Sequence, residues 1–277
     1  MTRSLAFVAA VLATGCLRAE QPSIVNAKLQ TVQVSGALSK TIESVIKSTT
    51  GPLWIGYTMP APSAENHSCC WSNGGRTGCG LEGRMASPVP PTGPIRLEGS
   101  SFVSILLRAD GGEIRKVRSY GLDCPLDGGG LPVYWLSNVQ PTESIAYLEG
   151  IAATRDEGAL HAISMHKDPA ADHVLLRLAR SGSTSKVRGQ GLFWIAHRAS
   201  REAARAITEA VDNDPDTEVK KKAVFALSQL PKEEGVPLLI QVARTHVNPA
   251  VRKQAMFWLG QSNDARAIQF FEQILLK

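Results

Sequence analysis

Cysteines are the residues of this chain whose spacing most clearly suggests chemistry. Four of the five cysteines lie in or near one glycine- and proline-rich region: Cys69, Cys70, Cys79 and Cys124. An even number of cysteines in one irregular region is typical of disulfides in an exported protein. A bond between adjacent cysteines is strained, so Cys69 and Cys70 are expected to take different partners, one Cys79 and the other Cys124. Two pairings remain open.

A metal site is the alternative use of the same sulfur atoms. His67 and the four thiolates are ligand types that zinc accepts. Cys70 and Cys79 are nine residues apart, however, and the chain has no Cys-x-x-Cys, so the spacing favours disulfides. Redox catalysis is disfavoured too, because an active cysteine pair normally has close spacing at a helix N-terminus. The sequence therefore predicts no metal and no cofactor.

The motifs of common catalytic sites are missing from the sequence. It has no Gly-x-Ser-x-Gly, no phosphate-binding Gly-x-x-x-x-Gly-Lys-Ser/Thr and no His-Glu-x-x-His. His161 and His166 are five residues apart, so they do not share a helix face as a metal-binding pair at i and i+4 would. We therefore predict that this protein is not an enzyme.

The start of the chain predicts export. Arg3 precedes an apolar run over residues 5–13, and polar residues follow from Glu20. This pattern indicates a secretory signal peptide over residues 1–19, and the apolar run is short for a membrane span. The alternative is lipid attachment at Cys16. The residues before that cysteine resemble a bacterial lipobox but lack the aliphatic residue expected three positions earlier.

Composition and charge limit the class of partner. A chain of 277 residues, 43% of them hydrophobic, can form one large domain or two ordinary domains with a buried core. Removal of residues 1–19 takes away two arginines and no acidic residue, so the formal charge falls from +5 to +3. A surplus this small does not favour nucleic acid as a partner.

Residues 20–142 are interpreted as a β-rich, cysteine-containing domain. A short helix carries Leu38, Ile42 and Val45 on one face. Strands are expected over residues 27–35, 53–59, 102–108, 113–120 and 131–136, with a long loop over 63–93. The third and fourth strands flank an Asp-Gly-Gly turn and form a hairpin. Ile114 and Val117 are out of phase in that hairpin, which favours a bulge.

Residues 143–277 contain a repeat. Val187, Val219 and Val251 recur at an interval of 32 residues, each followed by apolar residues at helical spacing. The register defines four units, about 152–183, 184–215, 216–247 and 248–277. A fixed period of this size indicates stacked helix pairs. We therefore predict an α+β protein of two domains, in which a mostly-β domain precedes an all-α superhelix of about four helix pairs.

The repeated phrase points to a family. Val-Arg/Lys-x-x-Ala/Gly-x-x-x-Leu/Ile-Gly/Ala/Ser resembles HEAT repeats of the short bacterial type, also found in phycobilin lyases and deoxyhypusine hydroxylases. The resemblance covers residues 145–277 and leaves the N-terminal half unrecognised. It does not extend to the hydroxylases, which hold iron with His-Glu pairs, because none of the six histidines here is followed by glutamate.

The resemblance implies a superhelix whose second helices line a concave, partner-binding face. By register, that face carries His173, Arg177, Arg180, Arg205, Glu209, Asp212, Gln241, Arg244, Gln269 and Gln273. These residues mix both charge signs and favour no one type of partner. On the first helices, the resemblance implies that Arg188, Lys220 and Arg252 pair with acidic residues of a neighbouring unit. Trp194 and Trp258 are expected in the core.

Two functions follow as hypotheses. The first is an exported HEAT-repeat protein, periplasmic or extracellular, that acts as a non-enzymatic protein–protein interaction scaffold in the bacterial cell envelope. The alternative is an enzyme or small-ligand-binding protein with a site between the β domain and the array, where Trp54, Tyr57, His67 and Trp135 would gather. The alternative requires several of these side chains to be partly exposed around a concavity.

Overall fold

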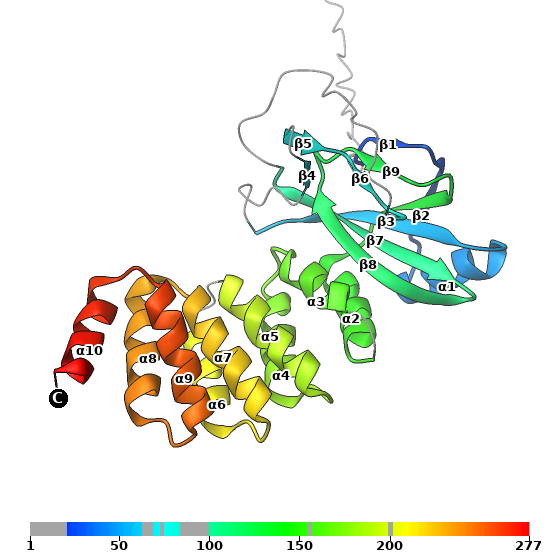
Figure 1. Ribbon diagram of the computed structural model, residues 1–277. Helices are drawn as coiled ribbons and strands as arrows, with labels where there is room; N and C mark the ends of the chain where they lie inside the picture. The colour runs from blue at the N-terminus through cyan, green and yellow to red at the C-terminus, as the bar shows by residue number, and fades with distance from the viewer. Residues whose placement is uncertain are drawn as a thin grey trace, which may run out of the picture.

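A computed structural model of the chain describes residues 21–62, 69–72, 75–83, 100–154, 157–198 and 202–276. The predicted signal peptide, Cys16 and His67 lie outside the described residues. A strand-rich N-terminal part is followed by a row of helices (Figure 1). The predicted fold class, a mostly-β region followed by a helical repeat array, is confirmed.

The main sheet has five strands in the order β2-β10-β3-β7-β8. The elements of this half are β1 (Ile24–Val25), β2 (Lys28–Gln33), α1 (Leu38–Ser48), β3 (Leu53–Pro60), β4 (Cys70–Ser72), β5 (Gly75–Thr77), β6 (Cys79–Gly80), β7 (Phe102–Asp110), β8 (Glu113–Gly121), β9 (Leu126–Asp127) and β10 (Pro132–Ser137). Strand β10 is parallel to both of its neighbours, whereas β3, β7 and β8 are antiparallel. The predicted strands are therefore present, and short strands β4 to β6 lie in the region expected to be one long loop.

The β7–β8 hairpin forms as its sequence predicts. Gly111 and Gly112 both have positive φ, 59° and 81°, as a two-residue turn between twisted antiparallel strands requires. Arg108 pairs with Lys116 while Ala109 pairs with Ile114. The register thus skips one residue of β8, and the predicted bulge is confirmed.

The central strands β3 and β7 of the main sheet are buried on both faces. On one face, a small sheet of order β1-β9-β6 covers an apolar cluster built from Trp54, Cys79, Leu81, Leu106, Cys124, Leu126, Val133 and Trp135. On the other face, Ile55, Tyr57 and Ile105 pack against α1 and the first helices of the array. Side chains alternate between the faces of a strand, so neighbouring residues Trp54 and Ile55 belong to different cores.

The helices form four consecutive pairs after a leading helix. They are α2 (Pro141–Ala152), α3 (Glu157–Ser164), α4 (Ala170–Ser181), α5 (Ser185–His197), α6 (Ala203–Asn213), α7 (Thr217–Gln229), α8 (Lys232–Thr245), α9 (Pro249–Gln261) and α10 (Ala265–Leu275). First helices α3, α5, α7 and α9 contact one another in sequence, and so do α2, α4, α6, α8 and α10. The pairs α3–α4 to α9–α10 coincide with the four predicted units.

Capping residues recur with the repeat. Thr184, Asp216 and Asn248 each precede a first helix, and the side-chain oxygen of each accepts a hydrogen bond from a backbone N–H of that helix's first turn. Ser/Thr/Asp/Asn caps of this kind stabilise a helix by about 1 kcal/mol each. The same three positions therefore fix where the second, third and fourth units begin.

The sheet and the array share one hydrophobic core. Apolar residues from β3, β7 and β8 belong to the same cluster as residues of α2 through α10. Strand β8 packs against α3, and Ser119 Oγ lies 2.9 Å from His161 Nδ1 at this junction. The backbone N–H of Lys167 also donates to the carbonyl oxygen of Pro60 at 2.8 Å. The two halves are thus joined by apolar packing and by hydrogen bonds.

Candidate functional site

The exposed sides of α4, α6, α8 and α10 form what we call the second-helix face. All ten residues that the sequence assigned to a partner-binding face are exposed on these helices: His173, Arg177, Arg180, Arg205, Glu209, Asp212, Gln241, Arg244, Gln269 and Gln273. The repeat register alone was enough to place them, because equivalent positions of stacked helix pairs face the same way.

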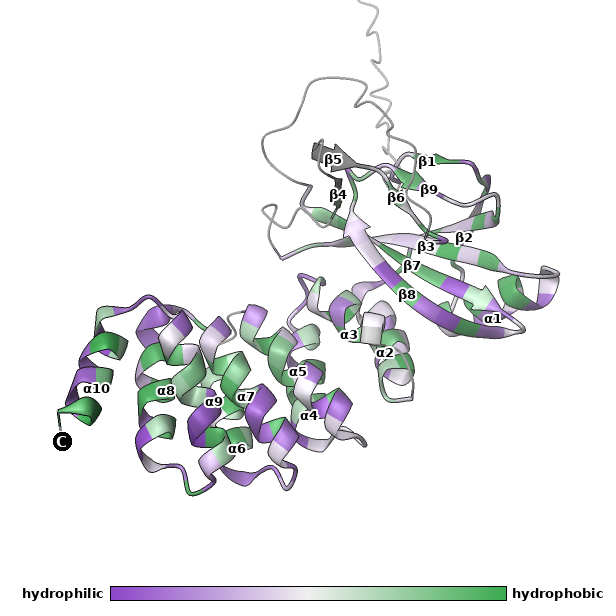
Figure 2. Ribbon diagram, in the orientation of Figure 1, coloured by the Kyte–Doolittle hydropathy of each residue, from purple (hydrophilic) through white to green (hydrophobic). Residues whose placement is uncertain are grey.

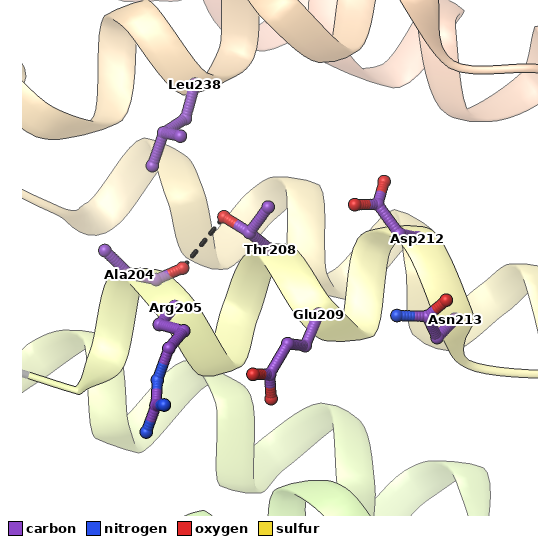
Figure 3. Close-up of a pocket in the computed structure, with 7 residues that line it drawn as sticks. All are labelled: Ala204, Arg205, Thr208, Glu209, Asp212, Asn213 and Leu238. Atoms are coloured by element: carbon purple, nitrogen blue, oxygen red, sulfur yellow. Dashed lines mark hydrogen bonds between the residues drawn. The ribbon is translucent and has the colours of Figure 1, made fainter.

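A groove of about 330 Å³ lies on this face between α6 and α8. Its lining residues are Ala204, Arg205, Thr208, Glu209, Asp212, Asn213 and Leu238. In Figure 3, the polar side chains project from α6 while Leu238 comes from α8 on the opposite side. Thr208 donates its hydroxyl to the carbonyl oxygen of Ala204 (2.8 Å). The groove therefore combines apolar surface with charged side chains of both signs.

Several side chains of the second-helix face also tie neighbouring helices together. Arg177 of α4 forms a bidentate ion pair with Glu149 of α2, with both oxygens 2.6 Å from Nη2. Arg180 lies 3.3 Å from Glu209 of α6, and Arg244 donates to Gln273 of α10 at 2.5 Å. Arg205, in contrast, contacts Glu202, the residue just before its own helix, at 3.6 Å. Arg205 is thus the arginine of this face least needed to hold the array together.

The basic column on the first helices binds mainly backbone, so the expected pairing with acidic neighbours was largely wrong. Lys220 donates to the carbonyl oxygens of Val211 and Asp212 at the end of α6. Arg252 donates to His246 O (2.7 Å) and Val247 O (3.1 Å) after α8. The last carbonyl groups of a helix lack intrahelical partners and carry its negative dipole end, so they attract cations.

Arg188 is the member of this column that does pair with an acid. Its Nε and Nη2 lie 2.8 and 3.1 Å from the carboxylate oxygens of Asp214, within the same unit rather than the neighbouring one. Burial alone would raise the pKa of Asp214, but hydrogen bonds from Arg188 hold that pKa below its usual value. The pair is therefore ionised and fixes the end of α6 against α5.

Aromatic side chains connect successive first helices, which the sequence analysis missed. The ring of Phe193 stacks on Phe225 (5.6 Å between centroids), and Phe225 in turn contacts Trp258 (4.6 Å). Trp194, next to Phe193, packs on His161 (4.5 Å). Trp194 and Trp258 are half-buried rather than in the core. Phenylalanine at the same position of consecutive repeats was the signal for this aromatic row.

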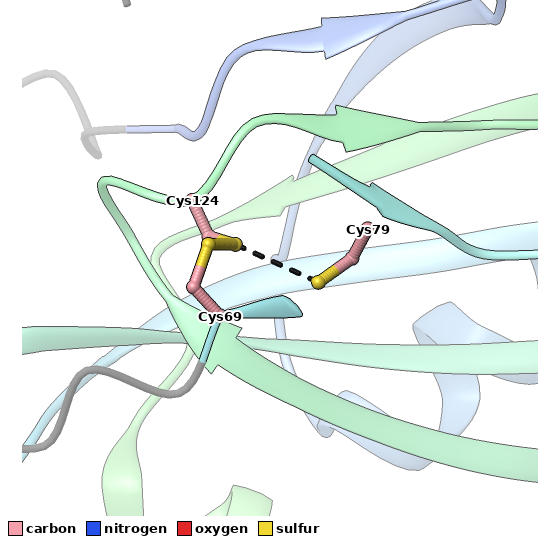
Figure 4. Close-up of side chains that lie close together, drawn as sticks. All are labelled: Cys69, Cys79 and Cys124. Carbon is pink, nitrogen blue, oxygen red and sulfur yellow. Dashed lines mark hydrogen bonds between the residues drawn. A yellow bond between two sulfur atoms is a disulfide. The ribbon is translucent and has the colours of Figure 1, made fainter. Parts of the chain in front are cut away.

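The four cysteines of the β-rich half come together in two disulfides. Cys69 bonds to Cys124, and Cys70 bonds to Cys79. The sulfur atoms of Cys79 and Cys124 lie 3.7 Å apart (Figure 4). Cys69 and Cys70 take different partners, as expected. The cluster could offer thiolates to a metal ion only after both bonds are reduced, because a disulfide sulfur has no thiolate to give.

The three described residues of the predicted interdomain site do not gather around a concavity. Trp54, Tyr57 and Trp135 are all buried, and the two tryptophans pack under the small sheet while Tyr57 faces the opposite core. The alternation of side chains along β3 separates them. A groove of about 590 Å³ does lie between α1, β8 and α2, where Leu38, Ile114, Glu143 and Tyr147 are among its lining residues. None of the three described residues lines it.

A serine and a histidine lie side by side in the buried junction. Ser144 Oγ is 2.9 Å from His166 Nε2 and 2.9 Å from the hydroxyl of Tyr57. The Nδ1 of His166 donates to the carbonyl oxygen of Ala162 (2.8 Å), which leaves Nε2 as a proton acceptor. Such a pair can activate a nucleophile, but all three side chains are fully buried. The arrangement therefore supports the fold rather than a reaction with a substrate.

Burial also sets the protonation state of the two histidines at the junction, His161 and His166. It lowers the pKa of His166 to about 4, and the charge of Arg198 acts in the same direction. It likewise lowers the pKa of His161 to about 4, with a smaller contribution from His197. Both histidines are thus neutral at pH 7 and serve as hydrogen-bonding groups.

Comparison with known families agrees with the geometry of the array. Residues 204–277 match the family model for HEAT repeats. This region runs from α6 to α10, and the N-terminal half has no family match. No curated protein matches the chain. The groove between α6 and α8 lies within this matched region, and HEAT repeats are a fold that suggests protein interaction.

No helix among the described residues is long and apolar enough to cross a membrane.

Proposed function

We propose that this chain is an exported, non-enzymatic scaffold of the bacterial cell envelope that binds another protein through its second-helix face. The groove between α6 and α8 carries the proposal. Arg205, Glu209 and Asp212 surround its apolar surface. Protein interfaces commonly combine an apolar centre with a polar rim.

The rigidity of this face supports the same proposal. Ion pairs and hydrogen bonds link α2 to α4, α4 to α6, and α8 to α10. A surface held in place before binding loses less conformational entropy on association. A partner therefore meets a preformed surface whose specificity comes from the exposed side chains of α6 and α8.

A photo-crosslinking amino acid at Thr208 tests the groove in the source cells. We expect it to join the chain to a discrete partner protein, whereas the same probe at Lys253, exposed on first helix α9, should not. Purified partner should bind an Arg205→Glu variant at least about tenfold more weakly. Lys253→Glu changes the net charge equally and should bind normally. Equal crosslinking at both positions, or equal binding by both variants, would contradict the proposal.

Export is tested separately. The pattern of residues 1–19 and the two disulfides support it. Mass spectrometry of the protein from envelope and secreted fractions should find an N-terminus at Glu20, or at a lipid-modified Cys16 if the anchor hypothesis holds. An intact N-terminus on protein confined to the cytoplasm would refute the envelope location while leaving the binding face untouched.

A further inference from the structure

The four disulfide-bonded cysteines differ in exposure. Cys69 and Cys70 are half-buried, whereas Cys79 and Cys124 are each 0% exposed. Each disulfide therefore joins a half-buried cysteine to a fully buried one. The sulfur atoms of the two fully buried cysteines lie 3.7 Å apart although they belong to different disulfides (Figure 4).

Backbone contacts also hold Cys79 close to Cys124. Strands β6 and β9 pair in parallel, with Cys79 opposite Leu126. The backbone N–H of Cys79 donates to the carbonyl oxygen of Pro125 at 2.9 Å, and that of Leu81 donates to Asp127 O at 2.9 Å. The two cysteines therefore remain neighbours when a bond to Cys69 or Cys70 is broken.

The surroundings of the two buried cysteines are apolar. Trp54, Leu81 and Leu126 belong to the same cluster, and strand β1, which is hydrophobic in Figure 2, forms one edge of the small sheet. Apolar surroundings disfavour a thiolate. A negative charge produced on Cys79 or Cys124 is therefore stabilised when it moves to a more exposed sulfur.

We propose that the two disulfides form a redox relay that accepts two electrons from an external dithiol. Its product has a single bond, between Cys79 and Cys124, and leaves Cys69 and Cys70 as adjacent thiols. No residue of the second-helix face takes part, so the relay does not depend on the proposed partner binding.

One route begins at Cys70. A thiolate of the dithiol attacks Cys70 Sγ, forms a mixed disulfide and expels Cys79 as a thiolate, which is the nucleophilic form of the side chain. The backbone N–H of Cys70 lies 2.9 Å from Cys79 Sγ and stabilises this charge. The Cys79 thiolate then attacks Cys124 Sγ and expels Cys69. The second thiol of the reductant releases Cys70 from the mixed disulfide, so the reductant becomes a disulfide and its two protons end on Cys69 and Cys70.

The other route begins at Cys69 and reaches the same product. Attack on Cys69 Sγ expels Cys124, whose thiolate attacks Cys79 Sγ and expels Cys70. In either route, rotation of the expelled side chain about its Cα–Cβ bond aligns its sulfur with the second disulfide, because the broken bond no longer holds it. Groups held this close react with a high effective concentration.

The relay changes what the small sheet is bonded to. In the oxidised protein, Cys69 and Cys70 tie the start of β4 to Cys124, before β9, and to Cys79 in β6. After the exchange, β6 remains bonded to the segment before β9, whereas β4 has lost both bonds. The relay is therefore a redox-controlled release of β4 from the small sheet.

Limited reduction of the folded full chain tests the relay. A Cys16→Ser chain is treated with one molar equivalent of dithiothreitol, quenched with acid to stop exchange, and alkylated in denaturant. Trypsin leaves Cys69 and Cys70 on one peptide and separates it from those of Cys79 and Cys124, because Arg76 and Arg118 lie between them. We expect mass spectrometry to find two alkyl groups on the first peptide and a bond between the other two. A first product alkylated on one cysteine of each native pair, Cys70 with Cys79 or Cys69 with Cys124, would overturn the proposal.

Single variants test the exchange without a reductant. Cys69→Ala and Cys70→Ala each remove a half-buried cysteine, and in both we expect Cys79 to be bonded to Cys124. Cys79→Ala and Cys124→Ala are the matched controls, which should each keep the remaining native bond. Circular dichroism checks that all four are folded. If dithiothreitol opens both disulfides together, these variants decide, and native bonds kept in Cys69→Ala and Cys70→Ala would overturn the relay.

Discussion

Close packing leaves no room for a side chain at Gly56 in β3. A Cβ added there would lie 2.4 Å from the ring of Trp135, which is buried between the two sheets. We expect Gly56→Ala to destabilise the protein by about 1–3 kcal/mol through overpacking, measured by urea unfolding. Gly150→Ala is the control, because a Cβ added at that position of helix α2 would meet nothing within 4 Å. It should be neutral or stabilising, and a smaller loss for Gly56→Ala than for this control would contradict the packing argument.

His166 predicts how stability depends on pH. Its folded pKa is about 4 against a reference of 6.5, so between these values the unfolded chain binds a proton that the folded chain does not. The free energy of unfolding should therefore fall as pH drops from 6.5 to 4, by about 3 kcal/mol for this residue, and its contribution should level off below pH 4.

Urea unfolding across this pH range provides the measurement. A His166→Gln variant should be less stable at pH 7 because it loses hydrogen bonds to Ser144 and Ala162. Its stability should also depend less on pH, by about one proton between pH 4 and 6.5. An unchanged slope would show that His166 is not the group that titrates.

At the scale of elements, the two disulfides hold the short strands β4 and β6 to the connection between β8 and β9. Cys69 and Cys124 are separated by 55 residues, whereas Cys70 and Cys79 are separated by 9. In the chain-entropy model, the longer loop gives the larger stabilisation, about 4 against about 3 kcal/mol. Replacing Cys69 and Cys124 by alanine should therefore lower the free energy of unfolding more than replacing Cys70 and Cys79. Chemical denaturation of both variants compares them, and the reverse order would refute the prediction.

The whole molecule is expected to unfold as one unit across the junction. The sheet and the array share a hydrophobic core, and buried Ser144 links Tyr57 of β3 to His166 after α3. In a Trp194→Phe/Trp258→Phe variant, fluorescence reports mainly on the sheet, while far-ultraviolet ellipticity reports on the helices. The two probes should give coincident midpoints. Separate transitions would mean that the junction does not couple the halves.

Local sequence patterns predicted most helices, strands and turns, because the formation of each depends mainly on residues close together in the sequence. The Asp-Gly-Gly turn predicted the hairpin, and the phase slip between Ile114 and Val117 predicted its bulge. The predicted acidic partners of Lys220 and Arg252 were wrong, because both side chains donate to backbone carbonyl groups instead. A sequence marks acidic side chains as possible partners, but every residue has a carbonyl, and only packing shows which ones lie within reach.

The sequence by itself determined the helical repeat, its register and the side of the helices on which the ten candidate binding residues lie. These follow from a period of 32 residues and helical geometry. The tertiary structure decided which cysteines pair and that Trp54 and Tyr57 face opposite cores. Contacts between distant segments depend on how sheet and array pack, and that packing follows from the surface the whole chain buries rather than from a local pattern.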